Sequence, residues 1–152
     1  NFGCYLRFIT DLATNRLETY HGSEGVGLAL VDQNDCGWEL FIDRSRGNIR
    51  SAPLILAVRY IHYGQPQRRN LVAADFIEET YAENEEVVFA IEFVNDRVRF
   101  WASTPGTARQ LLHSTAGNRG TASISKVRVI AGGYRKAELK TQFLGCQVYL
   151  LE

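Results

Sequence analysis

The sequence predicts an all-β fold in which two antiparallel sheets pack face to face, and three observations favour it. Apolar and polar residues alternate over short runs, as expected for strands with one buried face. Glycine, asparagine and proline separate these runs at the spacing of turns. Helical character is confined to residues 75–83, so we expect at most one short helix there.

The clearest strand pattern lies in residues 86–103, which we expect to form a long hairpin turning at Asn95-Asp96. Before the turn, one face carries Val87, Phe89, Ile91 and Phe93, and the other carries Val88, Ala90, Glu92 and Val94. After the turn, Val98, Phe100 and Ala102 alternate with Arg97, Arg99 and Trp101. The further expected strands are residues 4–8, 25–31, 38–42, 54–63, 68–73, 108–113, 126–130 and 143–151.

Composition indicates one globular domain over residues 1–152. The formal net charge is zero, which gives no reason to expect nucleic acid as a partner. No apolar run approaches the roughly 20 residues that span a bilayer, so we expect no membrane insertion. The chain begins at Asn1 and contains no methionine, and we expect it to be processed or excised from a longer protein.

Basic residues gather in the expected loops, where arginine predominates. Guanidinium groups pair with carboxylate and sulfate through two hydrogen bonds, so these loops are candidate sites for acidic or sulfated ligands. The candidate ligand-binding residues are Arg44, Arg46, Arg50, Arg68, Arg69, Arg135 and Lys136. The alternative is that they are ordinary solvated loops.

The three cysteines lack the paired spacing of a zinc site. If the terminal strands lie side by side, a Cys4–Cys146 disulfide is geometrically natural. Cys36–Cys146 is the alternative pairing, and three reduced thiols in a cytosolic protein are a third possibility. With one bridge formed, the remaining cysteine could link the chain into an oligomer.

Catalytic motifs are missing from the sequence, so we expect no enzymatic activity. No G-x-S-x-G motif or phosphate-binding glycine loop occurs. A glycosidase on such a sandwich needs two carboxylates facing a cleft. Of the six glutamates near the hairpin, at positions 78, 79, 83, 85, 86 and 92, we expect only Glu92 to lie within a strand. Hydrolysis is therefore the least favoured of the functions considered.

Three segments resemble laminin-G-like domains, which are jelly-roll sandwiches of the concanavalin-like class. They are the hairpin of residues 87–101, the Val127–Gly133 segment ending in Gly-Gly, and Phe143–Leu150 with its Gly-Cys step. The resemblance covers mainly residues 86–151 and implies a two-sheet antiparallel jelly roll. Other jelly-roll sandwiches, including galectin-like lectins, are the alternative.

The resemblance also implies a calcium site, because many laminin-G-like domains bind one calcium ion through loop acids. Asp32 and Asp35 lie in the Asp32-Gln-Asn-Asp35 turn and are the candidate ligands. The alternative is a turn whose side chains cap their own backbone. We expect no cofactor to be required.

These observations predict a secreted, extracellular recognition module that binds a protein or glycan ligand. Two other functions remain open. One is a structural subunit that assembles edge to edge or through the odd cysteine, and the other is a small glycosidase.

Overall fold

The computed structural model describes residues 1–11, 25–44, 54–62, 65–66, 71–72, 85–117, 124–132 and 140–152. Its strands are β1 (Phe2–Asp11), β2 (Gly25–Val31), β3 (Gly37–Arg44), β4 (Leu54–His62), β5 (Gln65–Pro66), β6 (Leu71–Val72), β7 (Glu86–Val94), β8 (Arg97–Ser103), β9 (Gln110–Ala116), β10 (Lys126–Gly132) and β11 (Lys140–Leu150). Within the described part of the chain there is no helix that could span a membrane.

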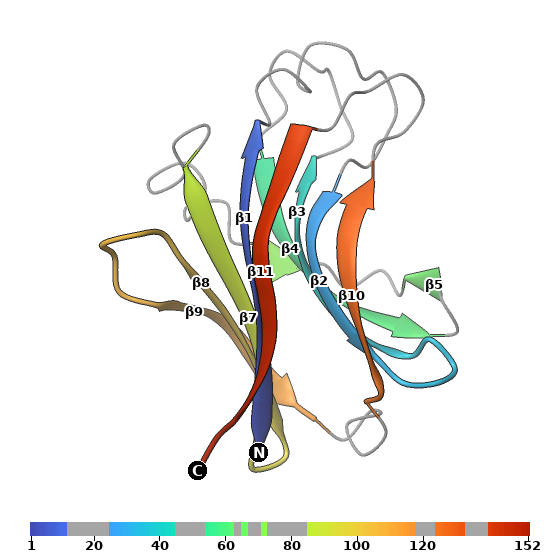
Figure 1. The fold of residues 1–152 in the computed structure, drawn as a ribbon. Coiled ribbons are helices and arrows are strands. Elements are labelled where there is room, and N and C mark those ends of the chain that lie inside the picture. Colours follow the sequence, from blue (N-terminus) through green and yellow to red (C-terminus); the bar gives the residue numbers. More distant parts are fainter. Residues whose placement is uncertain are drawn as a thin grey trace.

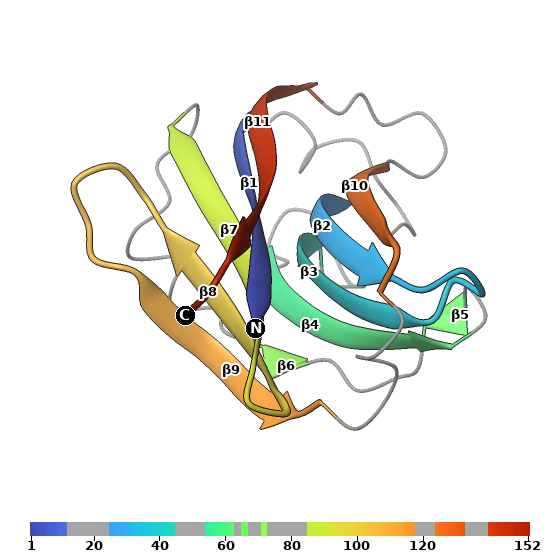
Figure 2. The ribbon, with the colours of Figure 1, turned by 60° about the horizontal axis from the view of Figure 1, so that its bottom comes forward.

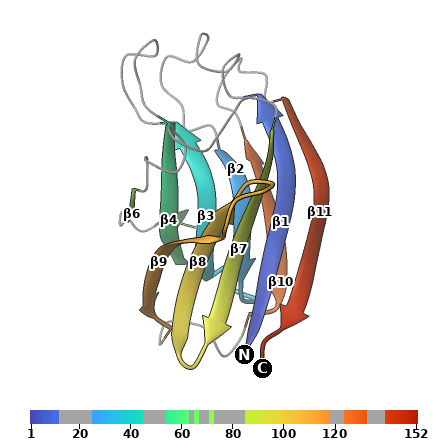
Figure 3. The ribbon, with the colours of Figure 1, turned by 90° about the vertical axis from the view of Figure 1, so that its left-hand side faces the viewer.

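Two antiparallel sheets form the all-β sandwich that the sequence predicts (Figure 1). Sheet A has the strand order β11-β1-β7-β8-β9, and Figure 3 shows it nearly face-on in front of the second layer. Sheet B has the order β10-β2-β3-β4-β5, with β6 also paired to β4. The first and last strands pair with each other, so the two termini lie close together (Figure 2).

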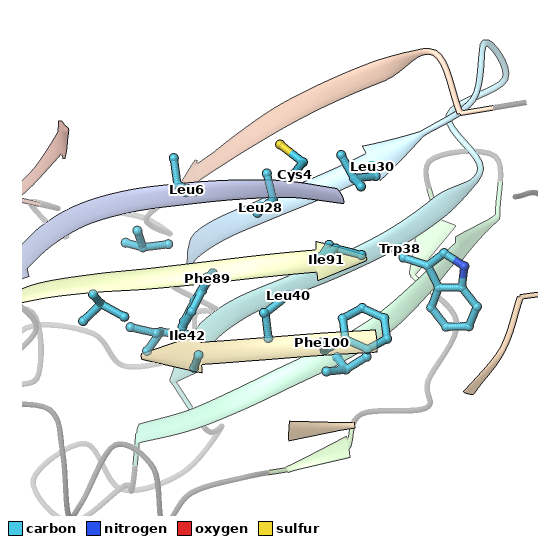
Figure 4. Packing of buried hydrophobic residues seen from close by; sticks show 14 of the residues in the cluster. Cys4, Leu6, Leu28, Leu30, Trp38, Leu40, Ile42, Phe89, Ile91 and Phe100 are labelled. Atoms are coloured by element: carbon cyan, nitrogen blue, oxygen red, sulfur yellow. The ribbon is translucent and has the colours of Figure 1, made fainter. Parts of the chain in front are cut away.

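The core lies between the sheets because alternate residues of each strand point inward. Leu6, Phe89 and Phe100 from sheet A meet Leu28 and Leu40 from sheet B (Figure 4). All five side chains are fully buried. Burying a large apolar side chain stabilises the fold by roughly 1.5–3 kcal/mol, so this layer is the main source of stability.

The predicted β7–β8 hairpin is confirmed, and it turns at Asn95-Asp96. Asn95 and Asp96 have φ values of 48° and 60°, which are the left-handed values that a two-residue type I′ turn requires. The burial of β7 alternates as predicted at the start of the strand, with Val87 and Phe89 fully buried. The outward residues of this hairpin are therefore presented on the outer face of sheet A.

The other predicted strands recur with shifted ends. The terminal strands are longer than predicted, because β1 and β11 pair with each other along almost their whole lengths. Of the predicted strand at residues 68–73, the structure describes Leu71–Val72, which form β6. The sequence did not predict β5. The expected short helix at residues 75–83 lies outside the described residues.

Candidate functional site

The outer face of sheet A carries a hollow of about 340 Å³, within the usual size range of ligand pockets. Strands β11, β1, β7 and β8 form its floor, and the β8–β9 loop contributes one wall. The lining residues are Tyr5, Arg7, Val88, Ala90, Trp101, Ala102, Ser103, Arg109 and Tyr149. Aromatic rings and small apolar side chains thus surround two arginines.

Strand register explains why these side chains meet. In one row across the sheet, Tyr5 of β1 is paired with Ala90 of β7, which is paired with Trp101 of β8. In the neighbouring row, Gly3 lies between Tyr149 and Glu92. Directly paired residues point to the same face, so both rows project outward from the sheet.

Glu92 is the polar centre of the site. It is a buried carboxylate with 4% of its surface exposed, although it lies on the outer face of β7. Arg109 Nη2 and Tyr149 Oη each donate a hydrogen bond to Glu92 Oε1, both at 2.7 Å. The β8–β9 loop and strand β11, which are distant in sequence, therefore both bind the same oxygen atom of Glu92.

The charge state of Glu92 follows from these contacts. Burial favours the neutral acid, but the hydrogen bonds from Arg109 and Tyr149 outweigh it and lower the pKa of Glu92. Burial and the Glu92 carboxylate together raise the pKa of Tyr149, which keeps its phenol protonated. Glu92 is thus an anion and Tyr149 a neutral donor at neutral pH.

Gly3 leaves the space that the Tyr149 side chain needs to reach Glu92. Tyr149 comes from β11 and Glu92 from β7, so the Tyr149 ring must cross β1 at Gly3. A Cβ atom at Gly3 would lie 2.5 Å from Tyr149 Cζ, closer than real carbon atoms approach. A side chain at this position would therefore displace the ring.

Trp101 forms one side of the hollow, and Arg109 lies across its ring. The Arg109 guanidinium carbon is 4.4 Å from the ring centroid, at cation–π distance. The Trp101 indole Nε1 is buried and has no hydrogen-bond partner among the described residues. The register places the ring on the outer face of sheet A, in the row next to Glu92.

Arg7 and Glu86 lie at the other end of the hollow. Arg7 Nε donates to Glu86 Oε1 at 2.6 Å, and this hydrogen bond lowers the pKa of Glu86. The hollow thus has one arginine at each end, Arg7 paired with Glu86 and Arg109 paired with Glu92.

The outer face of sheet B has a different character. Arg59 pairs with Glu39 at 2.9 Å and lies 4.1 Å from the centroid of the Phe41 ring. Burial raises the pKa of Glu39 even though Arg59 opposes the effect. Phe41 itself is buried, and so are Val31 and Ile61 on the same face.

The predicted calcium ligands occupy a turn in which each carboxylate already has a partner. Asp32 Oδ1 accepts hydrogen bonds from the backbone N–H groups of Asn34 and Cys36, at 2.7 and 2.9 Å. Asp35 pairs with Lys126 and Arg128 on β10, and the hydrogen bond from Lys126 lowers the pKa of Asp35. Calcium binding stays a prediction here, and these partners would have to yield to the ion.

The predicted cysteine pair is brought together. Cys4 Sγ and Cys146 Sγ lie 3.8 Å apart on neighbouring strands, and both are thiols in this structure. Cys36 lies at the other sheet, in the turn before β3. The Cys4–Cys146 disulfide therefore stays a prediction that the strand order favours over Cys36–Cys146.

Of the seven predicted ligand-binding residues, only Arg44 lies within the described part of the chain. Arg44 ends β3, and its side chain is not described. The other candidates, Arg46, Arg50, Arg68, Arg69, Arg135 and Lys136, lie outside the described residues. The hollow was missed because its arginines sit at Arg7 within a strand and at Arg109 within a short loop, away from any basic cluster.

Comparison with solved structures identifies the fold as a jelly-roll sandwich. The chain resembles the ancestral congerin Con-anc with a TM-score of 0.61 and 8% identity, over 98% of this chain and 92% of that one. It resembles chicken galectin 2 with a TM-score of 0.57 and 11% identity, over 97% and 89% of the two chains.

A mutant of the GH43 protein BlXynB from Bacillus licheniformis is also similar, with a TM-score of 0.58 and 12% identity. The match covers 97% of this chain but 27% of that one, so it concerns one part of a larger protein. No protein-family model and no curated protein matches the sequence significantly. The likeness supports the jelly-roll class that includes the laminin-G-like domains, without singling out that family.

Proposed function

We propose that this chain is a non-catalytic, extracellular recognition module that binds a carbohydrate in the hollow of sheet A. One observation carries the proposal: a buried carboxylate, Glu92, orders Arg109 and Tyr149 around the Trp101 ring. The galectin-like neighbours favour a carbohydrate over other small ligands.

The chemistry of the hollow suits a sugar. A sugar ring has apolar C–H faces that pack against aromatic rings, and hydroxyl groups at its edge that need hydrogen-bond partners. Tyr5, Trp101 and Tyr149 supply the rings. Arg7 and Arg109 are half-exposed and each keeps guanidinium N–H groups beyond the one paired with a carboxylate.

The carboxylates of this face argue against hydrolysis. Glycosidases use two carboxyl groups about 5–10 Å apart, one of them protonated as the general acid. Glu92 has a lowered pKa and is held by Arg109. Glu86 lies six residues along the same strand, about 20 Å away at the rise of an extended chain. A small glycosidase is therefore not the function we propose.

Binding to an array of neutral, sialylated and sulfated oligosaccharides tests the proposal. Trp101→Ala and Arg109→Ala should each weaken binding by about tenfold or more, since hydrogen bonds to charged groups and ring contacts are both lost. Arg128→Ala is the matched control, because its side chain is 44% exposed and pairs with a carboxylate, as Arg109 does at 48%. Binding lost in Arg59→Ala and retained in Arg109→Ala would place the ligand on sheet B and contradict the proposal.

Sulfated glycans are a finer form of the same proposal. The loop residues Arg44, Arg46, Arg50, Arg68, Arg69, Arg135 and Lys136 are the candidates for such ligands. Retention on a heparin column that collapses with added salt would support them, because exposed charge pairs are screened by salt. No retention near physiological salt would restrict the ligand to the hollow.

A structural role in a larger assembly is the second candidate, and strand β11 favours it. This edge strand carries no charged residue from position 141 to 150, whereas edge strands are commonly protected by charge. Size-exclusion chromatography with and without reductant would detect edge-to-edge or cysteine-linked oligomers. A monomer under both conditions would leave recognition as the function.

A further inference from the structure

The first and last strands place two thiols side by side beneath the candidate site. In the register, Cys4 is opposite Val148 and Cys146 is opposite Leu6, so both sulfur atoms lie on the inner face of sheet A. Their separation is 3.8 Å, and a disulfide bond of about 2.05 Å needs only a small side-chain movement. Cys4 is fully buried, whereas Cys146 is exposed at the sheet edge.

Strand β11 has little packing on this inner face. Val148 and Leu150 share the face with the buried residues of β1, yet their exposed fractions are 54% and 88%. Phe143, on the same side, is 41% exposed. The strand is therefore held mainly by its backbone ladder to β1 and by outer-face contacts such as that of Tyr149 with Glu92.

We propose that Cys4 and Cys146 form an oxidisable pair whose cross-link fastens β11 to β1 and so holds Tyr149 in the hollow. Tyr149 follows Cys146 by three residues on the same strand and points to the opposite face. A bond on the inner face thus stabilises the position of the ring on the outer face. The effect on ligand affinity rests on the proposed carbohydrate site, whereas the effect on β11 does not.

The reaction is a thiol–disulfide exchange with a small disulfide such as oxidised glutathione. The Cys146 thiolate attacks one sulfur of the oxidant, and one glutathione thiolate leaves. The Cys4 thiolate then attacks Cys146 Sγ of the mixed disulfide, and the second glutathione thiolate leaves. Two protein thiols are oxidised, one glutathione disulfide is reduced, and the two thiol protons pass to the released glutathione.

Accessibility fixes the order of these steps. Cys146 is at the surface and reacts first, because the oxidant can reach it. Burial, and then the neighbouring Cys146, raise the pKa of Cys4 to about 12. Closure by Cys4 should therefore be the slow step, and the mixed disulfide should accumulate before the bridge.

The test compares reduced protein with protein oxidised by oxidised glutathione. Intact mass should show a monomer that has lost two hydrogen atoms. Hydrogen exchange in residues 140–150 should slow by about tenfold or more on oxidation, because local opening of the strand is suppressed. Cys146→Ser should abolish both changes, and Cys36→Ser, which keeps the pair, should retain both.

The ligand arm uses lactose, maltose and cellobiose as neutral probes. Oxidation should tighten binding by about twofold to tenfold, because a larger fraction of molecules holds Tyr149 in place. Slower exchange with unchanged affinity would overturn the coupling and leave the proposed function intact. Two results would overturn the inference as a whole. One is a disulfide-linked dimer, and the other is an intramolecular disulfide that does not slow hydrogen exchange in β11.

Discussion

At the scale of single residues, the hollow depends on an unusual combination of a glycine and a buried acid. Gly3 leaves space on β1 for the Tyr149 ring, and Glu92 beyond it accepts a hydrogen bond from the phenol. Neither residue type suggests a binding site by itself. They form a site because the strand register pairs Gly3 with both Tyr149 and Glu92.

Replacing Gly3 by alanine should displace the Tyr149 ring. The ring is the far end of a side chain that can rotate away, so we expect the fold to survive with a loss of about 1 kcal/mol for the hydrogen bond to Glu92. Urea denaturation measures this loss. Gly145→Ala is the control, because no atom lies within 4 Å of its added Cβ. An equal loss in both variants would contradict the role of Gly3 in making room for the Tyr149 ring.

Replacing Glu92 by glutamine should make stability less dependent on pH. The folded state lowers the pKa of Glu92, so the ionised group contributes stability above its unfolded pKa of about 4.3. That contribution is lost as the pH falls through the folded pKa. At pH 7 the variant should be less stable by about 1–3 kcal/mol, since the hydrogen bonds to a charged acceptor are weakened.

Denaturation curves of wild type and Glu92→Gln between pH 7 and strongly acidic pH would measure this difference. The two proteins should converge in stability at the acidic end. Glu86→Gln, which alters a solvent-exposed pair with Arg7, should have a smaller effect at every pH. A difference that persisted unchanged in acid would show that Glu92 is neutral in the native state.

At the scale of elements, the β7–β8 hairpin was predictable because all its signals are local. Alternation defines the two faces, and Asn95-Asp96 suits the left-handed turn. The ends of β1 and β11 were less predictable, since they are set by pairing between opposite ends of the chain. β5 is a two-residue strand containing Pro66, and it has no period for a sequence pattern to reveal.

The turn itself offers a prediction about stability. Asp96 has a φ of 60°, which glycine adopts without strain, so Asp96→Gly should stabilise the hairpin by about 0.5 kcal/mol. Asp96→Val should destabilise it by about 1–2 kcal/mol, because a β-branched residue is strained there. Thermal or urea midpoints distinguish the two variants, and an opposite order would contradict the type I′ turn.

At the scale of the whole molecule, the two outer faces of the sandwich are unlike. Sheet A presents an open hollow with half-exposed arginines, whereas apolar residues on the outer face of sheet B, such as Phe41 and Ile61, are buried. The sequence predicted the sandwich, and it placed Glu92 on the face of its strand opposite to Val87 and Phe89. It could not predict the hollow, because the site joins β1, β7, β8 and β11 only once they are adjacent.

The chain contains two tryptophans, and they provide an internally controlled measurement of carbohydrate binding in the hollow of sheet A. Trp101 borders the hollow, whereas Trp38 is buried between the sheets against Phe100. Each indole N–H gives its own signal in a ¹H–¹⁵N NMR spectrum. Titration with an oligosaccharide that binds should shift the Trp101 signal progressively and leave that of Trp38 in place. A bound oligosaccharide that shifted neither signal would contradict a carbohydrate site on sheet A.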